Sequence, residues 1–122
     1  MIFNEIQKKI KEGDIIPKPE AKEDFRVIRI KGKRRGLPAL VYRVPNSKSD
    51  KKIEKGVNQD EFEAAYLQLK EVGSFTRDWF NSNLVKARIE GSCNFTTIGG
   101  IFELLEIAYY AERGCYRLIQ HK

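Results

Sequence analysis

The sequence predicts a mixed α+β fold, and two patterns support that prediction. Residues 25–44 contain two runs of β-branched and aromatic residues around a short basic segment, a pattern typical of a β-hairpin. Residues 58–120 contain three stretches with helical spacing of apolar residues, followed by two short β-rich runs. We therefore expect a helical module with a terminal hairpin, preceded by an N-terminal helix and a basic β-hairpin.

The composition fits one compact unit with its own apolar core. The chain has 122 residues, of which 41% are hydrophobic, a length that suits one domain and is short for two. No run approaches the roughly 18 uninterrupted apolar residues of a membrane span, and the N-terminus lacks the basic-then-apolar order of a signal peptide. We expect a cytoplasmic protein that does not insert into a membrane.

Residues that commonly perform catalysis or bind metals are scarce. The two cysteines, Cys93 and Cys115, are most simply free thiols, and the single histidine is His121. These residues form neither a metal-ligand set nor a nucleophile and base pair, and the glycines form no nucleotide-binding fingerprint. We predict no catalytic residue, no metal site and no cofactor, and we keep a small metal-dependent nuclease as an alternative.

The basic residues are concentrated in one part of the chain. Between Arg26 and Lys55 there are eleven basic and two acidic residues, a local balance of +9 in a chain of net charge +6. A positive surface of this density attracts phosphate backbones whatever their sequence, because binding releases counterions. A solvated basic loop without a partner is the alternative interpretation.

The N-terminal part is predicted to contain a helix and a hairpin. Apolar residues recur at helical spacing over residues 2–12, so we expect a short amphipathic helix there, docked on the body of the protein. Two prolines make residues 16–20 irregular. Strands at 25–30 and 39–44 then flank a basic tip at 31–38, whose cations would project toward a groove or a phosphate ridge. The cations of the tip are Lys31, Lys33, Arg34 and Arg35.

A polar stretch at residues 45–52 predicts an exposed linker and a boundary between two parts. Residues 1–50 would form the N-terminal helix and basic hairpin, and residues 51–122 the C-terminal module, packed together as one compact unit. The N-terminal helix or the edge of the hairpin could provide a homodimer contact, and the sequence decides neither between these two contacts nor against a monomer.

The C-terminal module is predicted to begin with two capped helices. Asn58 and Glu61 form a variant of the capping box at the start of the first helix, which ends at a glycine. Thr76 caps the second helix, which ends near Leu84. Residues 85–92 would form a turn or a short strand.

The third helix is predicted to be strongly buried. It starts near Asn94 or Thr96 and has its apolar residues on one face. Adjacent glycines inside a helix each cost on the order of 1 kcal/mol relative to alanine, so Gly99 and Gly100 predict close approach of another helix or of a ligand backbone. The last two β-rich runs turn at Arg113-Gly114, where glycine supplies the positive φ of a tight hairpin.

Residues 58–120 resemble the winged helix-turn-helix superfamily, whereas the first 57 residues lie outside the resemblance. It rests on the order of the last features, namely the third helix, Leu104-Leu105, a strand beginning at Ile107, the Arg113-Gly114 turn, Tyr116 and Leu118.

This resemblance implies that the third helix enters the major groove of double-stranded DNA while the wing contacts the neighbouring backbone or minor groove. Thr96 and Thr97 would then face bases or phosphates, and Arg113 and Arg117 would contact phosphate. Arg77, at the start of the second helix, is a further expected contact. The full set of expected nucleic-acid contacts is Lys31, Lys33, Arg34, Arg35, Arg77, Thr96, Thr97, Arg113 and Arg117.

The charge of the C-terminal module leaves two interpretations open. Residues 57–122 carry seven basic and nine acidic side chains, which is a poor balance for a module that binds DNA by itself. In the first interpretation, the winged helix supplies shape and the basic hairpin supplies phosphate attraction, as in an accessory or mobile-element DNA-binding protein that regulates transcription. In the second, the winged helix docks another protein and the basic segment meets an acidic partner.

Overall fold

The computed structural model describes residues 1–45 and 53–120, and it has the predicted α+β class. The N-terminal elements are α1 (Ile2–Lys9), β1 (Ile15–Ile16), β2 (Phe25–Arg34), β3 (Leu37–Val44) and β4 (Ile53–Asn58). The C-terminal elements are α2 (Gln59–Val72), β5 (Ser74–Thr76), α3 (Arg77–Asn83), α4 (Val85–Glu90), α5 (Asn94–Leu104), β6 (Ala108–Glu112) and β7 (Cys115–Leu118).

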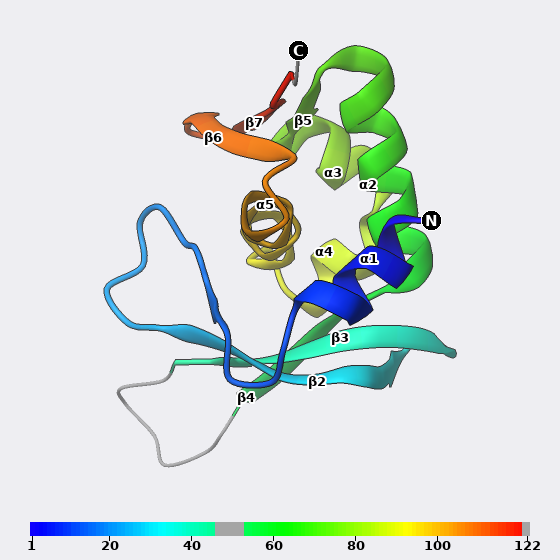
Figure 1. Ribbon diagram of the computed structural model, residues 1–122, viewed down its shortest axis with the longest axis vertical. Coiled ribbons are helices and arrows are strands. Elements are labelled where there is room, and N and C mark those ends of the chain that lie inside the picture. The colour runs from blue at the N-terminus through cyan, green and yellow to red at the C-terminus, as the bar shows by residue number, and fades with distance from the viewer. Residues whose placement is uncertain (46–52, 121–122) are drawn as a thin grey trace.

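Two antiparallel sheets lie on opposite sides of the helices. One has the strand order β1-β2-β3-β4 and the other the order β5-β7-β6. In Figure 1 the four-stranded sheet lies along the lower side and the three-stranded sheet at the top, with α5 between them. Because α5 contacts β1 and β4 of one sheet and β6 of the other, it is the element around which both sheets are arranged.

The predicted N-terminal helix forms and docks on the protein, although it ends at Lys9, before the predicted end. Ile2, Phe3 and Ile6 are its buried residues. The backbone N–H groups of Ile2 and Phe3 donate to the two carboxylate oxygens of Glu63 in α2, at 3.1 and 3.0 Å. This carboxylate satisfies donors that a helix N-terminus leaves unpaired, so it fixes α1 against α2.

The hairpin of β2 and β3 has a much tighter turn than predicted. β2 continues to Arg34 and β3 begins at Leu37, which leaves Arg35 and Gly36 in the turn. Both have positive φ, 55° and 78°, as a two-residue type I′ turn requires. The prediction of a long basic tip is therefore wrong, because its lysines and Arg34 belong to the strand.

Strand β4 was not predicted, because its sequence contains charged residues and a glycine rather than a run of β-branched ones. It completes the sheet by pairing with β3, with Val57 opposite Leu40. Residues 46–52 are outside the described residues. They include most of the predicted linker and the predicted boundary after residue 50. The four-stranded sheet nevertheless includes strands from both sides of that boundary.

The caps predicted for α2 and α3 are confirmed. Asn58 Oδ1 accepts a hydrogen bond from Glu61 N at 3.0 Å, and Glu61 Oε1 accepts one from Asn58 N at 2.9 Å. Thr76 Oγ1 accepts from the third backbone N–H of α3 at 3.2 Å. The turn or strand predicted after α3 is wrong, because residues 85–90 form the helix α4, whose Ala87 is buried in the core.

The two adjacent glycines of α5 allow close approach, but of different neighbours than predicted. A Cβ at Gly99 would lie 2.1 Å from the ring of Tyr116 in β7, and one at Gly100 would lie 2.5 Å from the carbonyl oxygen of Pro17. The close neighbours are therefore an aromatic ring and an extended segment, rather than a helix or a ligand backbone. The helix is covered on both of these sides.

The core is continuous between the N-terminal and C-terminal parts. Phe3 and Ile16 belong to the same cluster of buried residues as Phe62, Phe102 and Tyr116. Among the described residues, none of the helices combines the length and the apolar character needed to cross a membrane.

Candidate functional site

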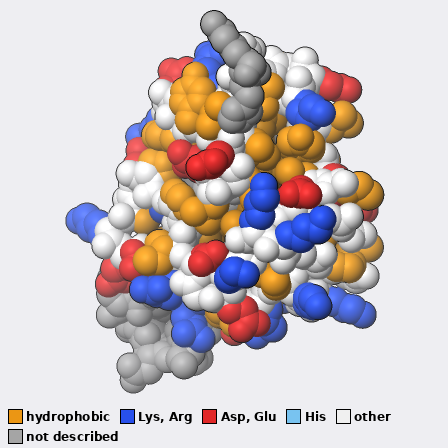
Figure 2. Space-filling view, viewed as in Figure 1, with side chains coloured by type: hydrophobic (Ala, Val, Ile, Leu, Met, Phe, Trp, Pro, Cys, Tyr) orange, Lys and Arg blue, Asp and Glu red, His pale blue; other side chains and the backbone are white. Residues whose placement is uncertain are grey.

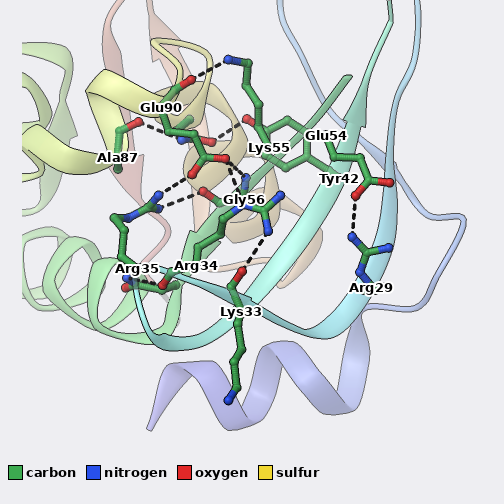
Figure 3. A network of polar contacts seen from close by, with 12 residues as sticks. Arg29, Lys33, Arg34, Arg35, Tyr42, Glu54, Lys55, Gly56, Ala87 and Glu90 are labelled. Carbon is green, nitrogen blue, oxygen red and sulfur yellow. Dashed lines mark hydrogen bonds and ion pairs between the residues drawn. The ribbon is translucent and has the colours of Figure 1, made fainter. Parts of the chain in front are cut away.

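The two arginines at the turn of the β2–β3 hairpin form ion pairs inside the protein. Arg35 donates to the two carboxylate oxygens of Glu61 at 2.6 and 2.9 Å, to the carbonyl oxygen of Gly56 at 3.1 Å, and to Glu90. Arg34 Nε donates to the other oxygen of Glu90 at 3.1 Å, so that two guanidinium groups share this carboxylate (Figure 3). The network fixes the hairpin turn against the start of α2 and the end of α4.

These contacts shift the pKa values of the paired groups. Burial would raise the pKa of Glu90, but hydrogen bonds from Arg35 and Arg34 outweigh burial and lower that pKa. Burial would also lower the pKa of Arg35, but hydrogen bonds to Glu61 and Glu90 raise it. Arg34 and Arg35 were predicted to contact phosphate, yet in this conformation protein carboxylates occupy both guanidinium groups.

The exposed residues of β2 are all basic. They are Arg26, Arg29, Lys31 and Lys33. Two of these cations are neutralised at the surface, since Arg26 lies 3.4 Å from Asp24 and Arg29 lies 2.5 Å from Glu54. Figure 2 shows Lys and Arg side chains along the lower part of the face in view, over the four-stranded sheet.

The remaining exposed cations of the four-stranded sheet have no ion pair among the described residues. Lys31 and Lys33 project from β2, and Arg43 is the exposed residue of β3. Of the four basic residues predicted for the hairpin, Lys31 and Lys33 are therefore the two that are available to a partner. Arg43 was missed as a candidate because it lies inside an apolar run.

Thr96 and Thr97 lie beneath the segment that precedes β2. Lys18 Nζ donates to Thr96 Oγ1 and Thr97 Oγ1, each at 2.8 Å, and to the carbonyl oxygen of Cys93 at 2.9 Å. Thr97 is fully buried and Thr96 is partly exposed. The base or phosphate contact predicted for Thr97 is therefore not possible in this conformation, because its side chain is covered.

Lys18 was not identified from the sequence, although it connects two distant segments. Its ammonium lies 4.4 Å from the centre of the Phe25 ring and 5.6 Å from that of Tyr42. Burial lowers the pKa of Lys18 from 10.5 to about 7, Cys93 opposes that shift, and Arg77 adds to it. The available signal was its position between two prolines, which hold the backbone extended.

A buried polar network lies next to Lys18 and was also missed. The Tyr42 hydroxyl donates to Asn94 Oδ1 at 2.5 Å and lies 3.2 Å from Cys93 Sγ. Asn94 Nδ2 in turn donates to the carbonyl oxygen of Ala87 at 2.8 Å. Burial raises the pKa of Tyr42 above its ordinary value, so the hydroxyl remains a donor and ties β3 to the start of α5.

A cavity of about 420 Å³ lies beside the start of α5. Its walls come from residues 18–21, from Phe25, from the first residues of α3 and α5, and from the turn between β6 and β7. Three residues that the sequence placed on separate elements, Arg77, Thr96 and Arg113, line this cavity together with Lys18. The structure thus groups one part of the predicted site around a hollow rather than on a flat surface.

The remaining predicted contacts lie elsewhere. Arg117 is exposed on β7, opposite Tyr109, and is not part of the cavity wall. In Figure 1 the β6–β7 turn lies at the upper left and the β2–β3 turn at the lower right. The predicted wing and the turn of the basic hairpin therefore lie on opposite sides of the protein in this view.

Neither a metal-binding cluster nor a similarity to known proteins helps to identify the site. Among residues 1–45 and 53–120, no group of three or more His, Cys, Asp or Glu side chains is arranged to hold a metal ion. Both cysteines are free thiols, as predicted. The chain matches no known family model, no curated protein and no solved structure in the comparisons made.

Proposed function

We propose that this chain is a small DNA-binding protein that contacts the phosphates of double-stranded DNA through the exposed cations of its four-stranded sheet. The observation that supports this is the set of exposed basic side chains on the sheet, with Arg26, Arg29 and Arg43 on one face and Lys33 on the other. Arg26 lies directly opposite Arg43 across the strand pair, so these two cations are close neighbours on one face. A duplex carries one negative charge per about 1.7 Å of its axis, so its phosphates attract a surface with several exposed cations.

We also propose that the elements from α2 to β7 form a winged helix-turn-helix. The order of helices and strands, with sheet order β5-β7-β6 and a final hairpin, supports this assignment. In this proposal α5 does not read the major groove, because the segment before β2 covers its first turn. Arg113 and Arg117 of the final hairpin remain exposed and can add contacts at a separate place.

Contacts of this kind favour sequence-tolerant binding. Phosphate contacts position a protein on a duplex without reading its sequence, which requires contacts to base edges. The exposed cations belong to a sheet surface rather than to a helix that fits the major groove. We therefore expect an accessory DNA-binding role with little preference among sequences.

The test is fluorescence-anisotropy binding to a random duplex across a salt series. A triple variant with Lys31, Lys33 and Arg43 changed to Gln should bind more weakly. Its plot of log K against log salt should be shallower by up to about 2.7, because each lost phosphate contact removes about 0.9.

The matched control removes the same charge elsewhere on the surface. Lys70, Lys86 and Arg88 are exposed on α2 and α4, and changing them to Gln should leave the salt slope unchanged. If both triple variants lost the same amount of duplex affinity, binding would depend on the net charge of the protein rather than on the cations of the sheet. Absence of duplex binding at low salt would remove the proposal.

A protein-docking role is the second candidate, and it is favoured by the exposed side of α4. Ile89 is 72% exposed and Val85 is 40% exposed, and Lys86 and Arg88 lie beside them. Apolar side chains flanked by cations suit an acidic, amphipathic partner segment. An Ile89→Gln variant should then lose its partner in co-purification while its duplex binding stays unchanged.

A further inference from the structure

The cavity beside the start of α5 is positively charged and has aromatic walls. Its charged lining residues are Lys18, Arg77, Arg113 and Glu20. Its aromatic lining residues are Phe25, Phe95 and Tyr110. When Lys18 is protonated, the lining has two positive charges in excess, so the cavity is suited to an anion.

The guanidinium of Arg77 uses only part of its hydrogen-bonding capacity within the described part of the protein. Its guanidinium lies 4.5 Å from the centre of the Phe95 ring, and Nη1 donates to the carbonyl oxygen of Ser92 at 2.7 Å. A guanidinium has five N–H donors, and the other donors of Arg77 have no acceptor among the described residues. Burial also lowers the pKa of Arg77, which means that its charge is partly desolvated and would gain from an anionic partner.

Arg113 stands at the mouth of the same cavity. Its side chain is 86% exposed, and its one ion pair among the described residues, with the 63% exposed side chain of Glu20, is long at 3.7 Å. An exposed pair of this kind contributes little free energy, so it can be exchanged for a stronger one. Because Arg77 and Arg113 line the same cavity, an anionic group bound there would meet the charge of both.

We propose that this cavity binds a nucleoside 5′-phosphate, either as a free nucleotide or as the phosphorylated end of a nucleic-acid strand. The phosphate would lie between Arg77 and Arg113, because arginine pairs readily with phosphate oxygens. The size of the cavity, about 420 Å³, falls within the range of ligand pockets and far exceeds what inorganic phosphate fills. Tyr110 and Phe25, the partly exposed aromatic residues of the lining, offer surfaces on which a base can stack.

Lys18 has a positioning role in this proposal rather than a ligand contact. Its ammonium already donates to three protein oxygens, those of Cys93, Thr96 and Thr97. These bonds hold residues 18–21 against α5 and so form one wall of the cavity. The positive charge of Lys18 adds to the potential that an anion meets inside.

The first experiment is isothermal titration of the intact protein with adenosine 5′-monophosphate, with adenosine and with inorganic phosphate. The nucleotide should bind at least about tenfold more tightly than either part, because it uses both the cations and the aromatic walls. A nucleotide that binds no better than phosphate, or shows no binding, would overturn the proposal.

Variants test whether the binding uses this cavity. Arg77→Gln should weaken nucleotide binding by about tenfold or more, since it removes a hydrogen bond to a charged group. Arg113→Gln should also weaken binding, and its exposed position keeps the test valid if Arg77→Gln unfolds the protein. Arg117→Gln removes the same charge from β7 outside the cavity and should change nothing; an equal effect of Arg113→Gln and Arg117→Gln would contradict the proposal.

A second titration separates the two sources of the ligand. A single-stranded oligonucleotide with a 5′-phosphate should bind more tightly than its 5′-hydroxyl counterpart if the natural ligand is a strand end. If only the free nucleotide binds, the ligand is a small molecule. The Lys31, Lys33 and Arg43 triple variant should retain nucleotide binding in either case, so failure of duplex binding and failure of this proposal are distinguishable.

Discussion

Lys18 Nζ and Thr97 Oγ1 are joined by a hydrogen bond of 2.8 Å that connects the segment before β2 to the first turn of α5. The first turn of a helix carries a partial positive charge, so an ammonium at this place opposes the helix dipole. The oxygen acceptors and the two aromatic rings around Lys18 offset part of this unfavourable interaction. The charge of this lysine therefore opposes folding even though its contacts hold the fold together.

Replacing Lys18 by Met should change how stability depends on pH. The pKa of Lys18 is 10.5 when unfolded and about 7 when folded, so between these values the unfolded state binds more protons. Stability from this group therefore rises with pH across that window, by at most about 1.4 kcal/mol per unit, and is flat below it. Urea unfolding of both proteins across the window should show a smaller rise for Lys18→Met, with exposed Lys22→Met as the control. If the free energy of unfolding depended on pH in the same way in both proteins, the burial of the Lys18 ammonium would be contradicted.

Replacing Glu90 by Gln should destabilise the protein near neutral pH. Two arginines would lose a shared carboxylate, at a cost of about 1–3 kcal/mol for a partly buried group. The pKa of Glu90 is lowered on folding, so its contribution is present above the ordinary value of 4.5 and is lost as pH falls through the folded value. The difference between the two proteins in urea unfolding should therefore shrink in acid. Glu54→Gln, which removes the surface pair with Arg29, should cost less than about 1 kcal/mol.

Replacing Gly99 by Ala should destabilise the protein, although alanine favours helices by about 1 kcal/mol. The new Cβ would lie 2.1 Å from the fully buried ring of Tyr116, which packs against the rings of Phe95 and Tyr110. Overpacking of this kind costs about 1–3 kcal/mol and outweighs the gain in helix propensity. Thermal unfolding should show the loss, whereas Leu104→Ala at the exposed end of α5 should have a smaller effect. A rise in melting temperature for Gly99→Ala would show that α5 is not packed this closely.

Removing the hydroxyl group should change the free energy of unfolding in opposite directions at two tyrosines. The hydroxyl of Tyr116 is buried without a hydrogen-bond partner among the described residues, so Tyr116→Phe should stabilise the protein by up to about 1 kcal/mol. The hydroxyl of Tyr42 donates to Asn94, so Tyr42→Phe should destabilise it by about 1–2 kcal/mol. Denaturant midpoints measured side by side test the pair, and a loss of similar size in both variants would contradict the assignment.

Local patterns in the sequence predicted most elements of the fold, because their causes are local. The caps at Asn58 and Thr76 depend on side chains within three residues of the amides that they accept from. Strand β4 was missed for the opposite reason. Its residues have weak strand propensity, and pairing with β3 decides their conformation.

The candidate site could be predicted only in part, because burial depends on contacts between distant segments. The sequence predicted that Lys31 and Lys33 are exposed cations next to the first strand of the hairpin, and both side chains are exposed. It could not show that Glu61 and Glu90 pair with Arg35, since these residues are far apart along the chain. The cover over Thr97 likewise depends on Lys18, 79 residues earlier.

The close contact between Gly100 and Pro17 limits how the chain can be shortened. A fragment starting at residue 53 would keep every element from β4 to β7, yet it would lose both the segment over α5 and the strand that pairs with β4. Its newly exposed surface would include an unpaired strand edge and the apolar side of a glycine-containing helix, both of which promote aggregation. The first third of the chain thus covers apolar surface of the C-terminal helices, which a shortened chain would expose.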